Sequence, residues 1–169
     1  MPTRSTRKRT RKASRRKQAV AIAVQRATQA RGIPSAARLA GWARAAARGA
    51  GDITLRVVGA AEGRRLNRAY RGRDYATNVL SFAYDTVPPI PGPCGDIVLC
   101  HPVVAREARA QAKTLAAHYA HLVVHGTLHL RGYDHLRPAD ARRMERAEIR
   151  ILRGLGYANP YVTHSPRES

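Results

Sequence analysis

Residues 125–135 read HGTLHLRGYDH, and this short segment predicts more about the protein than any other part of the chain. His125 and His129 are four residues apart in an apolar stretch, so a helix places both imidazoles on one face, close enough to share an ion. Gly132 then lets the chain turn back, and His135 can arrive from the loop as a third ligand. The spacing H-x3-H-x5-H therefore predicts a metal site.

Three neutral imidazoles with a fourth position left for water are typical of a catalytic zinc site, so Zn²⁺, one ion per chain, is the predicted cofactor. Nickel, cobalt and copper also bind nitrogen-rich sites. His121 is a rival ligand because it precedes His125 by one helical turn. However, His121 and His129 are separated by ~12 Å along a helix axis and cannot share one ion. We therefore place His121 beside the ligands or on the helix surface.

The three histidines and Gly132 also match the metalloprotease signature H-E-x-x-H-x-x-G-x-x-H. Gly126 takes the place of its catalytic glutamate, so the carboxylate that would activate water for peptide hydrolysis is missing from the motif. A standard metalloprotease mechanism is correspondingly disfavoured.

Outward from this segment, hydrophobic periodicity predicts four strands and about five helices in mixed order, and therefore a single α+β domain in which the histidine segment supplies a zincin-like metal helix. Strands are expected at 19–25, 52–58, 78–84 and 96–100, and helices at 35–49, 60–70, 102–113, 114–130 and from 138 to about 154. The last helix presents one apolar face, made of Ala141, Met144, Ala147, Ile151 and Leu152.

The charge of the chain points to a polyanionic partner. Its 31 Lys and Arg residues against 11 Asp and Glu residues give a net charge of +20. Residues 1–17 contain nine of the basic residues and no acid, which leaves 22 minus 11, or +11, on residues 18–169. Nucleic acid is the simplest partner. We expect residues 1–17 to form a disordered basic arm that raises RNA affinity, and residues 18–169 to form the folded domain.

Cysteine usage and the N-terminus favour a cytoplasmic protein. Cys94 and Cys100 are too few for a disulfide scaffold and are expected as reduced thiols. The apolar stretch from Ala19 to Val24 is too short to span a bilayer. The Arg-rich start has features of an export or organelle import signal, but the short apolar stretch and the interruption by Arg26 disfavour both.

The histidine segment resembles the H-G-x-L-H-L-x-G-Y-D-H signature of the YbeY family of bacterial rRNA-maturation endoribonucleases. The similarity covers about residues 18–163. Further matching blocks are Y-R-G-x-D at 70–74, TNVLSF at 77–82, GDIVLC at 95–100, and Gly156, Tyr157, Pro160 and Tyr161 near the C-terminus.

The resemblance implies a fold with a four-stranded mixed sheet and the metal helix packed beneath it. Its implied function is that of a metal-dependent, single-strand-directed endoribonuclease that acts in 3′ maturation of 16S rRNA and in ribosome quality control. It implies rRNA and the 30S subunit or 70S ribosome as partners, with a ribosomal protein or ribosome-associated GTPase as a further candidate. The family's ligands correspond to His125, His129 and His135, and its required arginine corresponds to Arg71. Asp134 either orients a ligand or is an exposed turn residue.

Arginines are the predicted contacts to RNA. Arg71, expected in a loop beside Gly72, can bind two phosphate oxygens with its planar guanidinium and is the predicted catalytic residue. Arg73 and Arg131 are predicted to bind substrate with it. Arg131 stands where the family commonly has an apolar residue, so a solvated side chain is its alternative interpretation. Ala83 stands where the family usually has proline, a change confined to the exit of a strand.

Two other functions remain open at this point. A non-catalytic ribosome assembly factor would use the metal to hold its fold and its positive surface to bind rRNA. A metal-dependent hydrolase of another ester or amide would use the same histidines. For the nuclease, the nucleophile is either water or the ribose 2′-hydroxyl. Tyr75 and Tyr84 serve either in base stacking or in packing.

Overall fold

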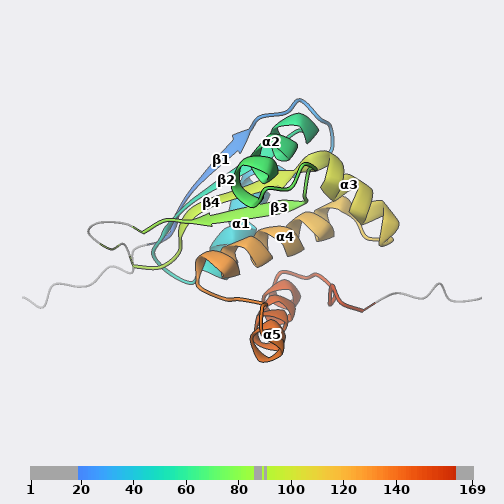
Figure 1. The fold of residues 1–169 in the computed structure, drawn as a ribbon. Helices are drawn as coiled ribbons and strands as arrows, with labels where there is room; N and C mark the ends of the chain where they lie inside the picture. Colours follow the sequence, from blue (N-terminus) through green and yellow to red (C-terminus); the bar gives the residue numbers. More distant parts are fainter. Residues whose placement is uncertain (1–18, 86–88, 90, 163–169) are drawn as a thin grey trace, which may run out of the picture.

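The computed structural model describes residues 19–85, 89 and 91–162, so the predicted arm lies outside the described residues. Within the described part, four strands and five helices follow one another in a single α+β unit (Figure 1), as predicted. The strands are β1 (Ala21–Arg26), β2 (Asp52–Val58), β3 (Val79–Ala83) and β4 (Cys94–Cys100). The helices are α1 (Ala36–Ala47), α2 (Ala60–Arg71), α3 (His101–Ala110), α4 (Leu115–Leu130) and α5 (Pro138–Gly154).

The strands form one mixed sheet in the order β1-β2-β4-β3. The pairs β1·β2 and β2·β4 are parallel, whereas β3 lies antiparallel to β4 at the edge of the sheet. Leu99 and Cys100 of β4 are both buried although they point to opposite faces, as expected for a strand covered by helices on both sides. The mixed sheet predicted from the sequence is thus confirmed, with β3 as its reversed edge.

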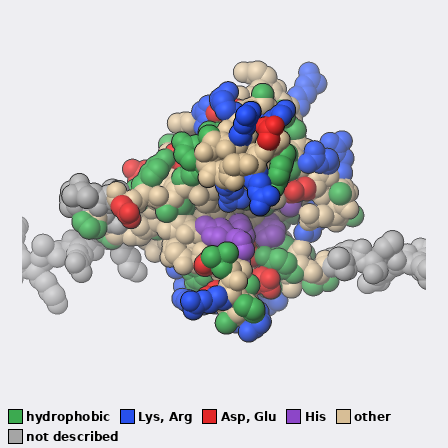
Figure 2. Space-filling model, in the orientation of Figure 1, with side chains coloured by type: hydrophobic (Ala, Val, Ile, Leu, Met, Phe, Trp, Pro, Cys, Tyr) green, Lys and Arg blue, Asp and Glu red, His purple; other side chains and the backbone are tan. Residues whose placement is uncertain are grey.

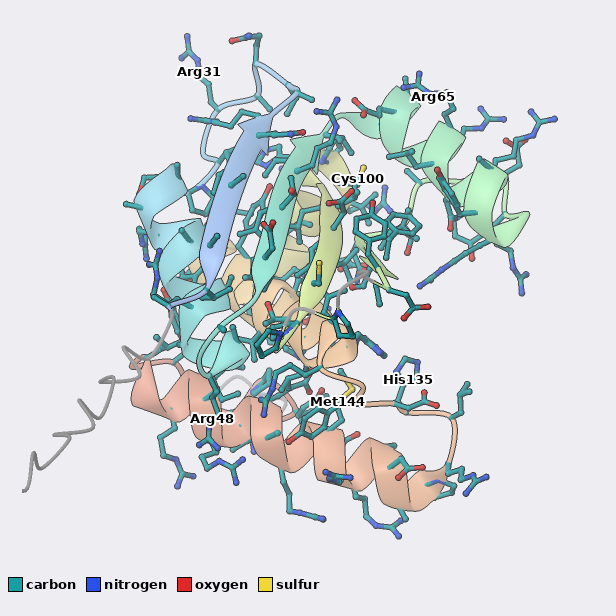
Figure 3. The ribbon with its side chains drawn as sticks, turned by 90° about the vertical axis from the view of Figure 1, so that its left-hand side faces the viewer. Arg31, Arg48, Arg65, Cys100, His135 and Met144 are labelled. Atoms are coloured by element: carbon teal, nitrogen blue, oxygen red, sulfur yellow. The ribbon has the colours of Figure 1, made fainter. Side chains whose placement is uncertain are left out.

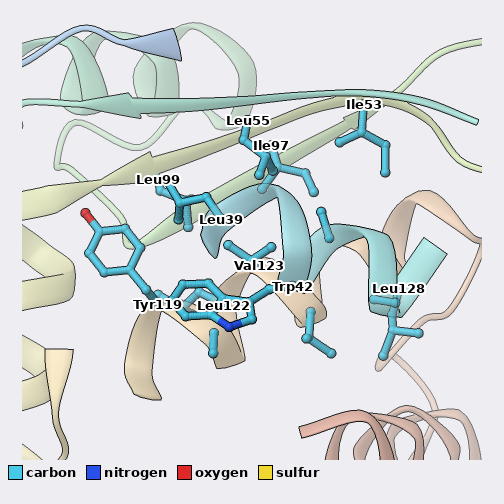
Figure 4. Close-up of a cluster of buried hydrophobic side chains, with 14 of the residues drawn as sticks. Leu39, Trp42, Ile53, Leu55, Ile97, Leu99, Tyr119, Leu122, Val123 and Leu128 are labelled. Carbon is cyan, nitrogen blue, oxygen red and sulfur yellow. The ribbon is translucent and has the colours of Figure 1, made fainter. Parts of the chain in front are cut away.

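The main hydrophobic core lies between the sheet and helices α1 and α4. Figure 4 shows Leu39 and Trp42 of α1 and Val123 of α4 packed beneath Leu55 and Leu99 of the sheet. A smaller cluster, on the face that α2 covers, contains Val58, Leu80, Val98, Cys100 and Val103. Helix α5 crosses beneath α4 (Figure 1). The apolar face predicted for α5 contributes its buried residues Met144, Ala147 and Leu152 to the main core.

Helix α4 approaches the sheet closely at Gly126. A Cβ atom at this position would lie 2.9 Å from Cγ2 of Ile97 and 3.1 Å from Oγ of Ser81, both on the sheet. Residue 126 therefore faces the strands and has no room for a side chain. This explains why glycine replaces the glutamate of the metalloprotease signature, since a larger residue would separate the helix from the sheet.

Gly126→Ala is expected to lower the free energy of unfolding by about 1–3 kcal/mol, because the added methyl group forces α4 away from β3 and β4. Urea denaturation of the metal-free protein measures the change. Gly41→Ala in α1 is the matched control, since a Cβ there meets no atom within 4 Å. That control is expected to gain about 0.5–1 kcal/mol from helix propensity. An unchanged stability of Gly126→Ala would contradict the close approach.

Several element boundaries differ from those predicted. Helix α2 continues through Arg71, which was expected in the following loop, and β4 begins at Cys94 because Cys94 pairs in register with Asp52. Cys94 and Cys100 are both free thiols at opposite ends of β4, ~20 Å apart at the rise of a strand and beyond disulfide reach.

Among the described residues, no helix has both the length and the apolar character needed to cross a membrane.

Candidate metal centre

Helix α4 carries the histidines of the predicted metal site. The helix begins after Thr114, whose hydroxyl caps it by accepting a hydrogen bond from the backbone N–H of Ala117 at 3.1 Å. It ends at Leu130, and Gly132 then adopts a φ of 87°, which favours glycine. The chain therefore reverses its direction at Gly132. The short segment between this turn and α5 then brings His135 over the end of α4. Figure 3 shows His135 on this segment beside Met144 of α5.

The structure brings His125, His129 and His135 together. One nitrogen from each ring lies within 4.8 Å of the others. The Nε2 atoms of His125 and His129 are 3.1 Å apart, and the ring centroid of His135 lies 4.9 Å from that of His129 and 5.9 Å from that of His125. His125 and His129 are half-buried, whereas His135 is exposed.

These nitrogens fit a tetrahedral metal ion. Two ligand nitrogens at 2.0–2.1 Å from a zinc ion lie ~3.3 Å apart, close to the Nε2 separation of His125 and His129. Burial lowers the pKa of His129, and the neighbouring His125 and His135 lower it further. The neutral imidazole, which is the form that binds metals, is therefore favoured at this position.

A buried carboxylate bonds the ring nitrogen of His125 that does not face the other two histidines. Glu148 of α5 is 0% exposed, and its Oε1 accepts a hydrogen bond from Nδ1 of His125 at 2.5 Å. Tyr161, beyond α5, donates its hydroxyl to the other oxygen of Glu148. Burial raises the pKa of Glu148, but its interactions with His121, His125 and Tyr161 outweigh this effect and hold the pKa at about 2. An ionised Glu148 keeps the proton of His125 on Nδ1, so that Nε2 presents its lone pair to a metal.

His121 lies beside the ligands, which is one of the two positions expected for it. Its Nε2 lies 3.6 Å from Oε1 of Glu148 and 3.4 Å from the hydroxyl of Tyr161. His121, His125 and Glu148 form a second group whose ligand atoms are close enough to hold an ion. In this group Glu148 is already bonded to Nδ1 of His125, which makes it a partner that orients the ring, and we therefore favour the group formed with His129 and His135.

The three histidines lie at a cleft of about 400 Å³ between the edge of the sheet and the end of α4. Figure 2 shows the histidines gathered in a hollow with Lys or Arg side chains directly above them. The described residues that line the cleft are Arg71, Thr77, Asn78, Val79, Ser81, Ala83, His125, His129, Leu130 and His135. Arg71 reaches this cleft from the last position of α2, and its side chain is exposed. The cleft lining contains no carboxylate among these residues.

A second polar network anchors Asn78, which lines the cleft. Asn78 donates to Oε2 of Glu107 at 3.0 Å, and the same oxygen lies 2.8 Å from Nε2 of His118. The side-chain oxygen of Asn78 also accepts from the backbone N–H of Val79 at 2.6 Å. This network ties the start of β3 to helices α3 and α4, so the polar loop before β3 keeps its place beside the histidines.

The structure does not bring all the predicted substrate contacts to this cleft. Arg73 is exposed on the loop after α2 and is not among the described residues that line the cleft. Arg131 donates to the backbone oxygen of Ala46 at 3.1 Å and lines a different hollow, because two residues past His129 it has rotated to the other side of the helix end. RNA binding by Arg73 and Arg131 thus remains a prediction. Asp134 is exposed and accepts from the backbone N–H groups of His135 and Leu136, which makes it a turn residue.

Comparison with known proteins identifies the family. The sequence model of a family described as Endoribonuclease YbeY matches residues 12–156. The chain belongs to the YbeY family. The endoribonuclease YbeY of Aromatoleum aromaticum is 56% identical over 146 residues, which cover 85% of this chain and 93% of that protein. The endoribonuclease YbeY of Bordetella petrii is 61% identical over 111 residues, which cover 66% of this chain and 71% of that protein.

One solved structure shares the fold of this chain. The solution structure of TM1509 from Thermotoga maritima matches with a TM-score of 0.51 and 22% identity, covering 86% of this chain and 99% of that one. At this identity the likeness concerns the fold alone. The YbeY family match begins at residue 12, inside the predicted arm, so the domain boundary at residue 18 stays a prediction.

Glu148 is the residue of this YbeY site that the sequence analysis missed. Its position on α5 places it among the apolar residues Met144, Ala147 and Ile151, which are those that face the core or pack against it. A carboxylate in the middle of an apolar helix face is a signal in its own right, because burial of an unpaired charge is strongly unfavourable. The partner it requires, His125, is 23 residues away in the sequence.

Glu148→Gln is expected to lower zinc affinity by about 10- to 100-fold, the usual effect of losing a carboxylate that orients a histidine ligand. Competition with a chromophoric chelator measures the affinity. Glu145→Gln on the same helix is the matched control, because Glu145 is exposed and has no hydrogen bond to a histidine among the described residues. Equal zinc affinities of Glu148→Gln and the wild type would show that Glu148 does not orient His125.

Proposed function

We propose that this chain is a zinc-dependent endoribonuclease that cleaves single-stranded RNA, acts in 3′ maturation of 16S rRNA and serves ribosome quality control. The observation that carries the proposal is the convergence of three imidazole nitrogens at a cleft that Arg71 also lines. Membership of the YbeY family supports the reaction class, because the relatives described above are named endoribonucleases.

The electrostatics of the cleft suit a phosphodiester substrate. Its described lining includes Arg71 and three histidines but no Asp or Glu, so an anionic backbone meets no like charge there. Thr77, Asn78 and Ser81 add polar side chains on the sheet side of the cleft. The standard metalloprotease mechanism uses a glutamate at the position of Gly126, and this glycine faces the sheet instead.

Each side chain of the cleft has a distinct role in the proposed reaction. His125, His129 and His135 hold the metal, which when bound supplies Lewis acidity toward a phosphate oxygen and lowers the pKa of water to ~7. Glu148 fixes the orientation of His125. Arg71 binds two oxygens of the scissile phosphate and stabilises the negative charge that grows as the phosphorus becomes pentacoordinate.

Cleavage of end-labelled 16S rRNA fragments by the purified protein tests the proposal. We expect cleavage within single-stranded segments after addition of zinc, loss of cleavage with a chelator, and recovery when zinc is restored. Binding of rRNA without metal-dependent cleavage would favour a non-catalytic assembly factor. Turnover of a peptide or small ester alone would favour a different hydrolase. Because contaminating ribonuclease is the obvious artefact, variants purified in parallel are required controls.

The proposed setting is the bacterial cytoplasm, with the 30S subunit or the 70S ribosome as the particle on which the enzyme acts. A ribosomal protein or a ribosome-associated GTPase is the proposed protein partner. The net charge of +20 supports association with rRNA, because counterion release from phosphates drives such binding. Co-sedimentation with ribosomal particles at increasing salt tests this setting, and a lack of any salt-dependent association would contradict it.

A further inference from the structure

A second hollow lies on the opposite face of β3 from the histidine cleft. Its described lining includes three aromatic residues, Tyr70 at the end of α2, Phe82 of β3 and Tyr84 just beyond β3. The rings of Tyr70 and Phe82 are 4.7 Å apart between centroids. Tyr70 is 67% exposed and Tyr84 is 53% exposed, so aromatic surface in this hollow is available to a ligand.

The hollow is suited to a flat neutral group. Among the charged residues that line it, Arg56 forms an ion pair with Glu62 at 2.8 Å, whereas the Asp96 carboxylate accepts a hydrogen bond from the neutral hydroxyl of Tyr84 at 2.5 Å. The bond to Asp96 also fixes the Tyr84 ring in place. A ligand therefore meets aromatic surface together with the negative charge of Asp96, which favours a neutral base over a phosphate in this hollow.

Polyanion binding is favoured next to the hollow. Residues 60–74, which form α2 and its following loop, contain five arginines against one glutamate and one aspartate. Tyr70 and Arg71 are neighbours in the chain, yet Tyr70 lines the aromatic hollow and Arg71 lines the histidine cleft. Along β3, Ser81 and Ala83 line the cleft while Phe82 lines the hollow. The edge strand β3 therefore lies between the histidine cleft and the aromatic hollow.

We propose that this hollow, formed by Tyr70, Phe82 and Tyr84, stacks one unpaired base of the RNA strand whose backbone occupies the histidine cleft. The strand would cross the free edge of β3, with a phosphate on Arg71 and the base of an adjacent nucleotide on Tyr70. The inference rests on the proposed function and adds to it a base-binding subsite that requires single-stranded RNA, because a paired base cannot enter the hollow. Stacking of this kind tolerates any base.

The test measures binding of a short unstructured RNA to the metal-free protein, so that no cleavage occurs during the measurement. Fluorescence anisotropy is expected to show a roughly 5- to 100-fold weaker affinity for Tyr70→Ala, the usual loss when one stacked base loses its aromatic partner. Tyr70→Phe keeps the ring and is expected to bind as the wild type does. Tyr75→Ala tests the other exposed tyrosine, which is 57% exposed on the nearby loop but is not among the residues lining the hollow, and is expected to lose less affinity than Tyr70→Ala.

An abasic nucleotide placed at successive positions of the RNA identifies the stacked base. At one position the loss of the base is expected to weaken wild-type binding as much as Tyr70→Ala does, and to have no further effect in that variant. Equal affinities of Tyr70→Ala and the wild type, or equal losses in Tyr70→Ala and Tyr75→Ala, would overturn the subsite.

A parallel cleavage assay on the zinc-loaded wild type separates this inference from the proposed function. Cleavage together with unchanged binding by Tyr70→Ala would retain the nuclease and remove the subsite. Tyr70-dependent binding without cleavage would retain the hollow as an RNA-binding site and remove the enzyme. Absence of RNA binding by the wild type would overturn both.

Discussion

In His129→Ala, zinc affinity is expected to fall by at least about 100-fold and metal-dependent RNA cleavage to be lost. A residue that merely orients a ligand already contributes 10- to 100-fold, and His129 supplies a ligand nitrogen itself. Its Nε2 lies 3.1 Å from that of His125, so its loss leaves two nitrogens that cannot hold the ion alone. Chelator competition gives the affinity, and cleavage of labelled rRNA fragments gives the activity.

The same variant distinguishes the two possible metal groups. His125 belongs to both, whereas His129 belongs to the group with His135 and His121 belongs to the group with Glu148. We therefore expect His121→Ala to keep zinc bound while His129→Ala loses it, and the reverse result would move the metal to the second group. His118→Gln on the same helix is the control for removal of an imidazole, because His118 bonds Glu107 and lies outside both groups.

The local part of the metal site could be predicted because helix geometry translates sequence spacing directly into distance. His125 and His129 had to share a face once residues 115–130 formed a helix, and the positive φ of Gly132 brought His135 back. The strands were predictable for a similar reason, since β2 alternates along its length and β4 is a short apolar run. Both kinds of inference depend only on residues close together in the chain.

The rest of the site depends on contacts between distant segments, which spacing rules do not provide. Glu148 meets His125 only because α5 packs against α4, and Tyr161 meets Glu148 only because the chain then returns along these helices. Arg71 was identified from a resemblance, and its place in the cleft follows from where α2 ends relative to β3. Gly126 showed only that a glutamate was absent, whereas the close approach to Ile97 gives the physical reason.

Arg71→Ala is expected to lower the single-turnover cleavage rate by roughly 10²- to 10³-fold, the usual cost of removing one donor to charge that develops in a transition state. Arg71 is exposed at the end of α2 and is not one of the candidate ligands, so zinc affinity and thermal unfolding should stay as in the wild type. Arg71→Lys keeps the charge but not the planar pair of donors, and we expect it to recover only part of the lost rate.

Arg150→Ala provides the control for the loss of one positive charge, because Arg150 is exposed on α5 and is not among the residues lining the histidine cleft. Its cleavage rate is expected to match that of the wild type at saturating protein. If Arg71→Ala and Arg150→Ala reduced only the affinity for RNA, and to the same extent, Arg71 would act as one more surface charge. If instead Arg71→Ala alone lowers the cleavage rate while zinc stays bound, the guanidinium of Arg71 acts at the scissile phosphate. That phosphate then lies beside the imidazoles that hold the ion.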